Sequence, residues 1–289
     1  MKNSIIHIVI SLIAFSLSYL LAYSTGLDLV KETVIIVFVI QWALFVPAYL
    51  FRTEKFFDLA GSVTYIFAVS FVVFKSNSDL LNYDIGSLIL SLVIIIWALR
   101  LGSFLFLRIK KAGEDKRFKE IKTSPTRFFM TWSLQGMWVS LCSACALTAL
   151  ANPIGIQTNL LFYFGLFIFL SGFVLEIIAD TQKSKFRSNT ENKNKFINTG
   201  LWSFSRHPNY LGEIILWLGI SVMSISALSG WQYITLISPV FTYVLLVYIS
   251  GIPLLKARGK EKWGHLSQYQ EYVDRTPTLF FNPLKRFDK

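Results

Sequence analysis

Apolar residues fill eight long stretches of this chain, and polar residues gather in the shorter segments between them. A helix needs roughly 20 mostly apolar residues to cross the hydrocarbon of a bilayer. The pattern therefore predicts an all-α fold, a multi-pass transmembrane helix bundle of about eight spans. The predicted spans are residues 5–23, 33–51, 56–74, 86–107, 128–151, 160–179, 208–228 and 231–255. The seventh has a polar first third, so we expect it to be partly re-entrant or partly buried.

The basic residues alternate with these spans. With the N-terminus placed inside, the inside segments hold 25 lysine and arginine residues, whereas the outside segments hold only Lys31 and Lys75. Short cytoplasmic loops of membrane proteins carry such an excess. We therefore expect both termini on the cytoplasmic side. Three basic segments, 108–127, 181–206 and 256–289, should lie there with them.

The composition supports the membrane class. The 289 residues are 54% hydrophobic and carry a net charge of +11, too apolar for an ordinary soluble domain. Because the charge is confined to segments between apolar runs, we expect membrane lipids rather than nucleic acid as partners. Cys142 and Cys145 lie in one apolar run without further ligands nearby, so we expect packing residues and no metal site.

The chain contains no internal repeat and no long linker, and its first apolar run is too long for a removed signal peptide. We therefore expect one integral membrane domain over residues 1–289, acting as a monomer. Its location would be a bacterial inner membrane or the endoplasmic reticulum.

Polar residues interrupt the start of the seventh span, at Arg206, His207, Asn209, Tyr210 and Glu213. Ionisable residues at membrane depth usually face a site rather than lipid. Ser203 and Ser205 are candidate N-caps and Pro208 suits a first turn. A helix that starts near Ser205 would present N–H groups that attract phosphate. His207 is either an acid or base, or a capping residue.

Glu176 and Asp180 share a helix face near the end of the sixth span. They would either pair with nearby basic residues at the interface or accept hydrogen bonds from a polar ligand. Arg100 and Arg108 share a face of the fourth span with Phe104, and snorkelling is the alternative to a ligand contact there.

The segment from Pro253 to Tyr272 is basic and aromatic. It suits an amphipathic helix on anionic lipid, and it also suits the lid of a nucleotide site with Tyr269 or Tyr272 stacking. No glycine-rich phosphate loop or dinucleotide fingerprint is present. Any nucleotide site must therefore be built from helix ends and loops.

These motifs resemble the steroid 5-alpha-reductase C-terminal family, specifically its DUF1295 branch of small multi-pass membrane proteins. The resemblance covers residues 97–283. It rests on Trp97-Ala-Leu-Arg100-Leu with Arg108, Glu176 with Asp180, Gly200-Leu-Trp-Ser-Phe-Ser-Arg-His-Pro-Asn-Tyr-Leu-Gly-Glu213, and Pro253-Leu-Leu with Tyr269-x-x-Tyr272. The Arg-His-Pro core is also close to that of isoprenylcysteine carboxyl methyltransferases. An S-adenosylmethionine-dependent methyltransferase therefore stays an alternative, as does a non-catalytic lipid-binding relative.

The resemblance implies an NADPH-dependent reductase of a carbon–carbon double bond in a lipophilic enone, such as a steroid or sterol-like lipid that enters from the bilayer. It implies a cofactor site in residues 97–289 that faces the cytoplasm. Combined with the residues above, the predicted cofactor-binding set is Arg100, Arg108, Glu176, Asp180, Arg187, Arg206, His207, Asn209, Tyr210, Glu213, Tyr269 and Tyr272.

The substrate end, in residues 1–96, departs from the family pattern. Animal members use a Gln-Glu pair and a tyrosine, but the tyrosine position here is Trp97. The third span offers Asp58 and Tyr65 on one helix face. We expect Asp58, Tyr65 and Trp97 to be catalytic; Asp58 alternatively begins its helix at the interface. Gln41 is a further candidate.

Overall fold

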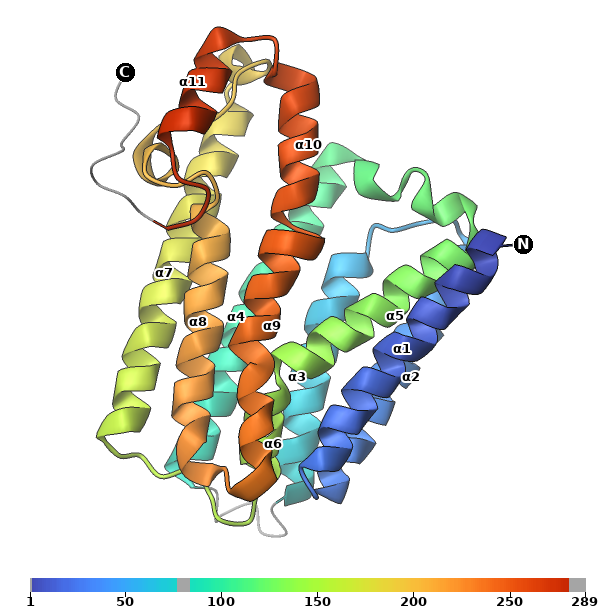
Figure 1. Ribbon diagram of the computed structural model, residues 1–289, viewed down its shortest axis with the longest axis vertical. Coiled ribbons are helices and arrows are strands. Elements are labelled where there is room, and N and C mark those ends of the chain that lie inside the picture. Colours follow the sequence, from blue (N-terminus) through green and yellow to red (C-terminus); the bar gives the residue numbers. More distant parts are fainter. Residues whose placement is uncertain (1, 77–83, 281–289) are drawn as a thin grey trace. The chain divides into compact units, whose positions relative to one another are not determined.

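The computed structural model describes residues 2–76 and 84–280. The described residues form helices and no strand. The helices of Figure 1 are α1 Lys2–Ser24, α2 Asp28–Leu50, α3 Phe57–Ser76, α4 Ile85–Ala112, α5 Pro125–Cys142, α6 Ala144–Ala151, α7 Leu160–Ser188, α8 Pro208–Ser224, α9 Ile237–Val244, α10 Ile252–Trp263 and α11 Ser267–Arg275. Short 3₁₀-helices include η4 Gly200–Ser203 and η6 Gly230–Leu236, and a π-helical turn, η7 Leu245–Ile249, follows α9. The basic tail beyond residue 280 and most of the predicted outside connection at 75–84 lie outside the described residues.

Among the described residues, seven helical segments are long and apolar enough to cross a membrane, and one of them is the segment Gly230–Trp263 that η6, α9, η7 and α10 form together. The number is eight if α5 and α6 count as one broken span. The chain is thus an integral membrane protein, and the predicted all-α multi-pass class is confirmed.

The broken span is the fifth rather than the seventh. Helices α5 and α6 meet at an angle of 55°. The hydroxyl of Ser143, between them, donates to the carbonyl of Val139 at 2.6 Å, and such bonds compete with the helix ladder. Helix α8 runs without a break. Of its apolar stretch of 18 residues, 61% is buried inside the protein. Of the two explanations for its polar first third, burial is therefore the one observed.

The chain folds into two compact units. Unit 1 comprises Met1–Tyr163 and Ser221–Ser238, and unit 2 comprises Phe164–Ile220 and Pro239–Lys289. Helices α7, α8 and α9 contribute residues to both units.

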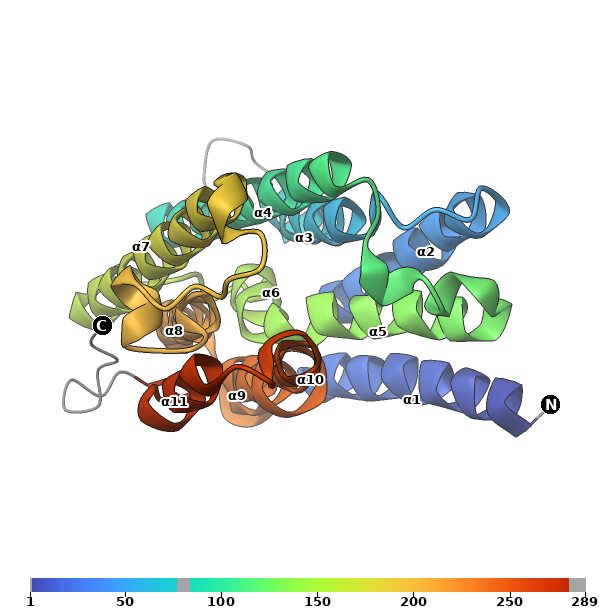
Figure 2. The same cartoon turned by 90° about the horizontal axis from the view of Figure 1, so that it is seen from above.

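In unit 1, α1 lies alongside α5 (Figure 2), α2 contacts α3 and α5, and α3 packs along α4. The centre is an aromatic cluster that includes Phe57, Phe118, Phe128 and Trp132. The rings of Phe57 and Trp132 meet edge to face with centroids 5.1 Å apart, a geometry that aromatic pairs favour. These contacts join α3 and α5 to the segment before α5.

At each end of unit 1, buried polar groups join the connections between the helices. Glu54, after α2, accepts from Lys122 Nζ at 2.6 Å and from the Asp115 N–H at 3.0 Å. Burial by itself would raise the pKa of the Glu54 carboxyl, but these two donors hold that pKa below its usual value. At the other end, Gln232 donates to Thr25 O and accepts from Asn152 Nδ2. Connections expected on one side of the membrane are thus bonded to one another.

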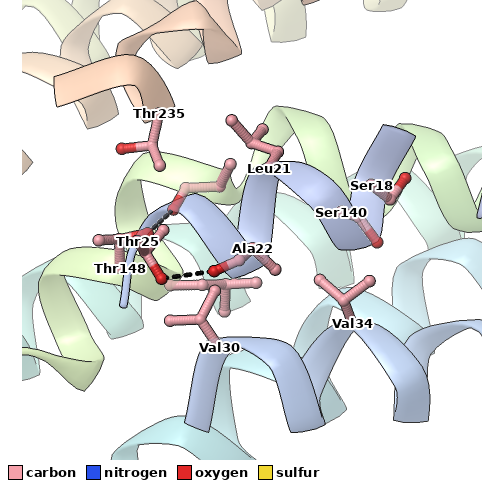
Figure 3. Close-up of a pocket in the computed structure, with 11 residues that line it drawn as sticks. Ser18, Leu21, Ala22, Thr25, Val30, Val34, Ser140, Thr148 and Thr235 are labelled. Atoms are coloured by element: carbon pink, nitrogen blue, oxygen red, sulfur yellow. Dashed lines mark hydrogen bonds between the residues drawn. The ribbon is translucent and has the colours of Figure 1, made fainter. Parts of the chain in front are cut away.

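A small cavity lies inside unit 1, between α1, α2, α5, α6 and η6 (Figure 3). Thr25 and Thr148 line it, and their hydroxyls donate to carbonyls of their own chain segments. Ser140 Oγ has no hydrogen-bond partner among the described residues. The full lining is Ser18, Leu21, Ala22, Thr25, Val30, Val34, Ser140, Ala144, Leu147, Thr148 and Thr235.

In unit 2, α7 and α8 run antiparallel with their backbones in contact. Glycines lie seven residues apart on each helix, Gly165 and Gly172 on α7 and Gly212 and Gly219 on α8. A Cβ added at Gly212 would lie 2.7 Å from the backbone N of Glu176. Small residues allow membrane helices this close approach. The contact fixes the start of α8 against the last turns of α7.

Candidate functional site

The candidate site in unit 2 begins at the first turn of α8. Pro208 opens the helix and His207 O accepts the first helical hydrogen bond, from Leu211 N at 3.2 Å. The Ser205 hydroxyl oxygen accepts from His207 N at 3.2 Å. Ser203 does not cap this helix, because its hydroxyl donates to Gly200 O within η4. The anion-attracting N–H groups of a helix start therefore follow His207.

The turn before α8 is docked on the end of α7. The Trp202 indole N–H donates to Ala179 O at 3.1 Å, and Leu201 N donates to Gln182 Oε1 at 3.0 Å. The Lys183 ammonium lies 4.2 Å from the centroid of the Trp202 ring, within the range of a cation–π contact.

Buried carboxylates of α7 meet the start of α8. Asn209 Nδ2 donates to Asp180 Oδ1 at 3.3 Å. Asp180, Glu176 and Glu213 are only 6%, 2% and 6% exposed. Ionisable side chains this buried in membrane helices usually serve a site. The predicted set of Glu176, Asp180, Asn209 and Glu213 is thus gathered along the α7–α8 contact.

Positively charged side chains gather around His207 at the start of α8, and Lys183, Arg206 and His207 are called the basic cluster below. Arg206 donates from its backbone N to Pro277 O at 2.9 Å and from its guanidinium to the Thr278 hydroxyl. Arg206 Nε and His207 Nδ1 are buried and have no hydrogen-bond partner among the described residues. Burial, with the charges of Lys183 and Arg206, lowers the pKa of His207 from 6.5 to about 3. The imidazole is therefore neutral near pH 7, and the surrounding charge favours an anion.

The segment after α11 contacts this basic cluster through Arg206, which the sequence did not indicate. Ser205 Oγ donates to Leu279 O at 2.8 Å, so residues 276–279 cross the start of α8 as a strap. The sequence signal is modest, since Thr276 and Pro277 end a helix without suggesting what the segment contacts.

The two tail tyrosines differ in their surroundings. The Tyr272 hydroxyl donates to Trp202 O at 2.7 Å, and the residue is only 5% exposed. Burial raises the pKa of this hydroxyl, which therefore stays protonated. Tyr269 is half-buried, with its ring centroid 5.1 Å from that of Phe196. Tyr272 thus supports the turn before α8, and the stacking role stays a prediction that suits Tyr269 better.

The remaining predicted arginines lie on α7 and α4. Arg187 is exposed at the end of α7. Arg100 and Arg108 belong to unit 1, where their guanidinium carbons lie 5.2 and 6.0 Å from the Phe104 ring centroid. The predicted shared face of α4 is thus present. His207 stacks on Tyr210, with ring centroids 5.7 Å apart.

The predicted catalytic residues all lie in unit 1. The rings of Tyr65 and Trp97 meet edge to face at 5.1 Å, and both residues are buried. Asp58 lies in the first turn of α3, two turns from Tyr65, and pairs with Arg117 at 3.3 Å. The structure therefore joins Tyr65 to Trp97 but gives Asp58 a partner at the helix start. Their catalytic roles stay predictions.

Two residues of α5 contact α3 near the predicted substrate end and were not among the residues that the sequence indicated. Gln135 Nε2 donates to Phe57 O at 3.0 Å, and the Tyr65 hydroxyl donates to Trp138 O at 3.4 Å. The available signal was an amide inside an otherwise apolar run. Among residues 2–76 and 84–280, no group of three or more His, Cys, Asp or Glu side chains is placed to hold a metal ion.

Comparison with known proteins gives two matches. The sequence model of the family described as "Protein of unknown function (DUF1295)" matches residues 44–276. A protein of Acanthamoeba polyphaga mimivirus named "Probable 7-dehydrocholesterol reductase" is 37% identical over 84 residues, which cover 22% of this chain and 18% of that protein. The similarity thus spans less than a fifth of the relative's length. No solved structure matches this chain.

Proposed function

This chain belongs to the DUF1295 family, and we propose that it is a membrane-embedded, NADPH-dependent reductase of a carbon–carbon double bond in a lipophilic substrate. The viral relative is named as a reductase of a sterol, and that name supports the reductase class for this chain. The family resemblance favours an enone or a sterol-like lipid as the substrate.

The observation that carries the proposal is the basic cluster at the start of α8. Arg206 and His207 each hold a buried polar nitrogen without a partner among the described residues. A helix start and two cationic side chains surround them, which is the environment that protein sites offer to phosphate. The phosphate groups of a dinucleotide fit these donors.

The neighbouring α7–α8 contact supplies a second kind of group. The Asp180 carboxylate and the Asn209 amide are hydrogen-bonded and buried. Carboxylates and amides suit the hydroxyls and the carboxamide of a nicotinamide dinucleotide. Bound NADPH would supply the hydride, while the protein orients it and excludes water.

The protein's own part at the substrate end is assigned to Tyr65 and Trp97. Reduction adds a hydride to one carbon of the double bond and a proton to the other. The Tyr65 phenol is the candidate source of that proton, and the Trp97 ring holds it in place. His207 is not proposed as the donor, because burial lowers its pKa to about 3 and its imidazole is neutral near pH 7.

The test is NADPH binding to the purified protein in detergent. We expect saturable binding that weakens at least about tenfold in Arg206→Ala, because a charge-assisted contact to phosphate is worth roughly 1.5–3 kcal/mol. Glu213→Gln should also weaken binding. Arg275→Ala is the matched control, since Arg275 is exposed and pairs with Glu271 at 3.0 Å. Absence of saturable binding would sink the proposal.

The same preparation tests the methyltransferase alternative. A ligand that binds only the folded state raises the unfolding temperature. We expect NADPH to raise it and S-adenosylhomocysteine to leave it unchanged; the reverse result would identify a methyltransferase. A protein that binds NADPH but reduces no lipid in a substrate panel would be the non-catalytic relative.

A further inference from the structure

The interior of unit 1 contains buried polar atoms that the proposed function does not use. Oε1 of Gln41, Oε1 of Gln135 and Nε1 of Trp138 have no hydrogen-bond partner among the described residues. Gln41 is 0% and Gln135 6% exposed. Buried polar groups in proteins are nearly always hydrogen-bonded, and in membrane spans they mark functional sites. These three atoms are therefore available to a polar group of a ligand.

The orientation of the Gln41 amide is fixed by its neighbour. The Thr64 hydroxyl donates its hydrogen to Ala60 O at 2.7 Å, so its oxygen can only accept from a further partner. Gln41 Nε2 donates to that oxygen at 2.9 Å. A flipped amide would place two acceptors together. The Gln41 oxygen is therefore held away from Thr64 as an acceptor.

The Gln135 amide is fixed in the same way. Its Nε2 donates at 3.0 Å to the Phe57 carbonyl, which has no hydrogen to give back. Gly61 leaves room for this amide, because a Cβ there would lie 2.5 Å from Gln135 Nε2. The Gln135 oxygen is thus a second buried acceptor.

One face of α3 borders the side-chain amides of Gln41 and Gln135 and the backbone of Trp138. Tyr65 donates to the backbone carbonyl of Trp138, one helical turn after Gln135 on α5. The α3 positions that contact the two glutamines and Trp138 are spaced as one helix face. They are Phe57, Gly61, Thr64 and Tyr65. The amides of Gln41 and Gln135 therefore contact α3 within about two turns of each other, beside the Tyr65–Trp97 pair.

The chemistry of the three atoms selects the ligand group. An amide oxygen without a partner needs a hydrogen-bond donor, which a ketone cannot provide. A hydroxyl can donate to an amide oxygen and accept from the indole N–H. The surrounding spans are apolar, so the rest of the ligand must be lipophilic.

We propose that Gln41 and Gln135 form a binding site for the hydroxyl group of a lipophilic molecule. This deepens the proposed function and rests on it in one respect: the molecule would be the substrate, a hydroxylated lipid oriented by its hydroxyl end. Gln41 and Gln135 would then be positioning residues for the reaction.

The test compares two probes that differ in one hydrogen-bond donor, cholesterol and its 3-methyl ether. Thermal unfolding of the purified full chain is followed in detergent without NADPH. We expect cholesterol to bind roughly tenfold or more tightly than the ether, the usual effect of one lost donor at a buried acceptor, and to raise Tm accordingly. In Gln41→Leu and Gln135→Leu this difference should disappear while the ligand-free Tm stays close to that of the native chain.

Gln232→Leu is the matched control, because Gln232 is a buried amide of the same unit whose oxygen accepts from Asn152 at 2.7 Å. It should lower Tm and keep the preference for cholesterol. If Gln135→Leu does not fold, the unbranched Gln135→Met replaces it. The inference is overturned if the native chain does not distinguish the probes, or if the glutamine variants keep the distinction. Because NADPH is absent, a failed cofactor test leaves this result unaffected.

Discussion

His207 is a residue whose protonation state is decided by its surroundings. Its ring lies beside Tyr210, and its Nδ1 atom is buried. The nearest charges that act on it, Lys183 and Arg206, are both positive. The sequence left acid–base and capping roles open. In the folded chain the backbone of His207 lies at the N-cap position of α8, and its neutral ring belongs to the basic cluster.

This burial predicts a pH-dependent stability. Between the unfolded pKa of 6.5 and the folded value of about 3, the unfolded chain binds more protons than the folded chain. The free energy of unfolding should therefore fall as the pH is lowered through this window, by at most about 1.4 kcal/mol per pH unit. Denaturant unfolding at several pH values without NADPH measures the slope.

His207→Asn should flatten that slope, since asparagine can occupy the same capping position without titrating. His265→Asn is the control, because His265 is exposed in the segment between α10 and α11. Equal slopes in His207→Asn and the native chain would contradict the assignment.

At the scale of elements, the α7–α8 contact positions the unit 2 site. Glycines spaced seven apart let the helix backbones touch, which sets Asn209 opposite Asp180. Both helices were predicted from their apolar runs. Their close contact was not predicted, because glycines inside an apolar run do not show which helix they face.

Gly212→Ala should therefore weaken both the fold and the cofactor site. The added Cβ would lie 2.7 Å from backbone atoms of Glu176 and Gly172, which cannot rotate away. Overpacking of this kind costs about 1–3 kcal/mol, so we expect a lower Tm together with weaker NADPH binding. Ser171→Ala, at an exposed position next to Gly172, is the control and should change stability by less than about 0.5 kcal/mol. An unchanged Tm in Gly212→Ala would argue against this contact.

For the whole molecule, the charge pattern predicts which ends of the spans face the cytoplasm. Within unit 1, Glu54 bonds to the basic segment before α5, and Gln232 bonds to Thr25 at the other end. In unit 1, connections that were predicted to lie on the same side of the membrane are thus the ones that bond to each other. Which side is cytoplasmic stays a prediction.

Cysteine labelling tests that orientation. Cys142 and Cys145 are both 0% exposed, so the native chain should give little background. In intact bacteria that express the protein, a membrane-impermeant maleimide should label Ile154→Cys, at an exposed position in the connection after α6. Glu261→Cys, at an exposed position on α10, should react only after the cells are permeabilised. The opposite pattern would reverse the topology.

The sequence by itself determined the class of fold and the places of the spans, because an apolar run of membrane length is a local property. It also identified most polar residues of the candidate site, since charged and amide groups are conspicuous inside apolar helices. Asp58 and Tyr272 show the limit of that signal. The sequence did not indicate that Asp58 pairs with Arg117, or that Tyr272 bonds to the turn that carries Trp202.

Only the tertiary structure decided which of these groups meet. Arg206 contacts a strap about 70 residues further along the chain, and Gln41 and Gln135 approach one face of α3 from two other helices. Such contacts depend on how closely helices pack and where a span breaks. Backbone approach at glycines and a bend at Ser143 set these features, and no local pattern of apolar and polar residues encodes their result.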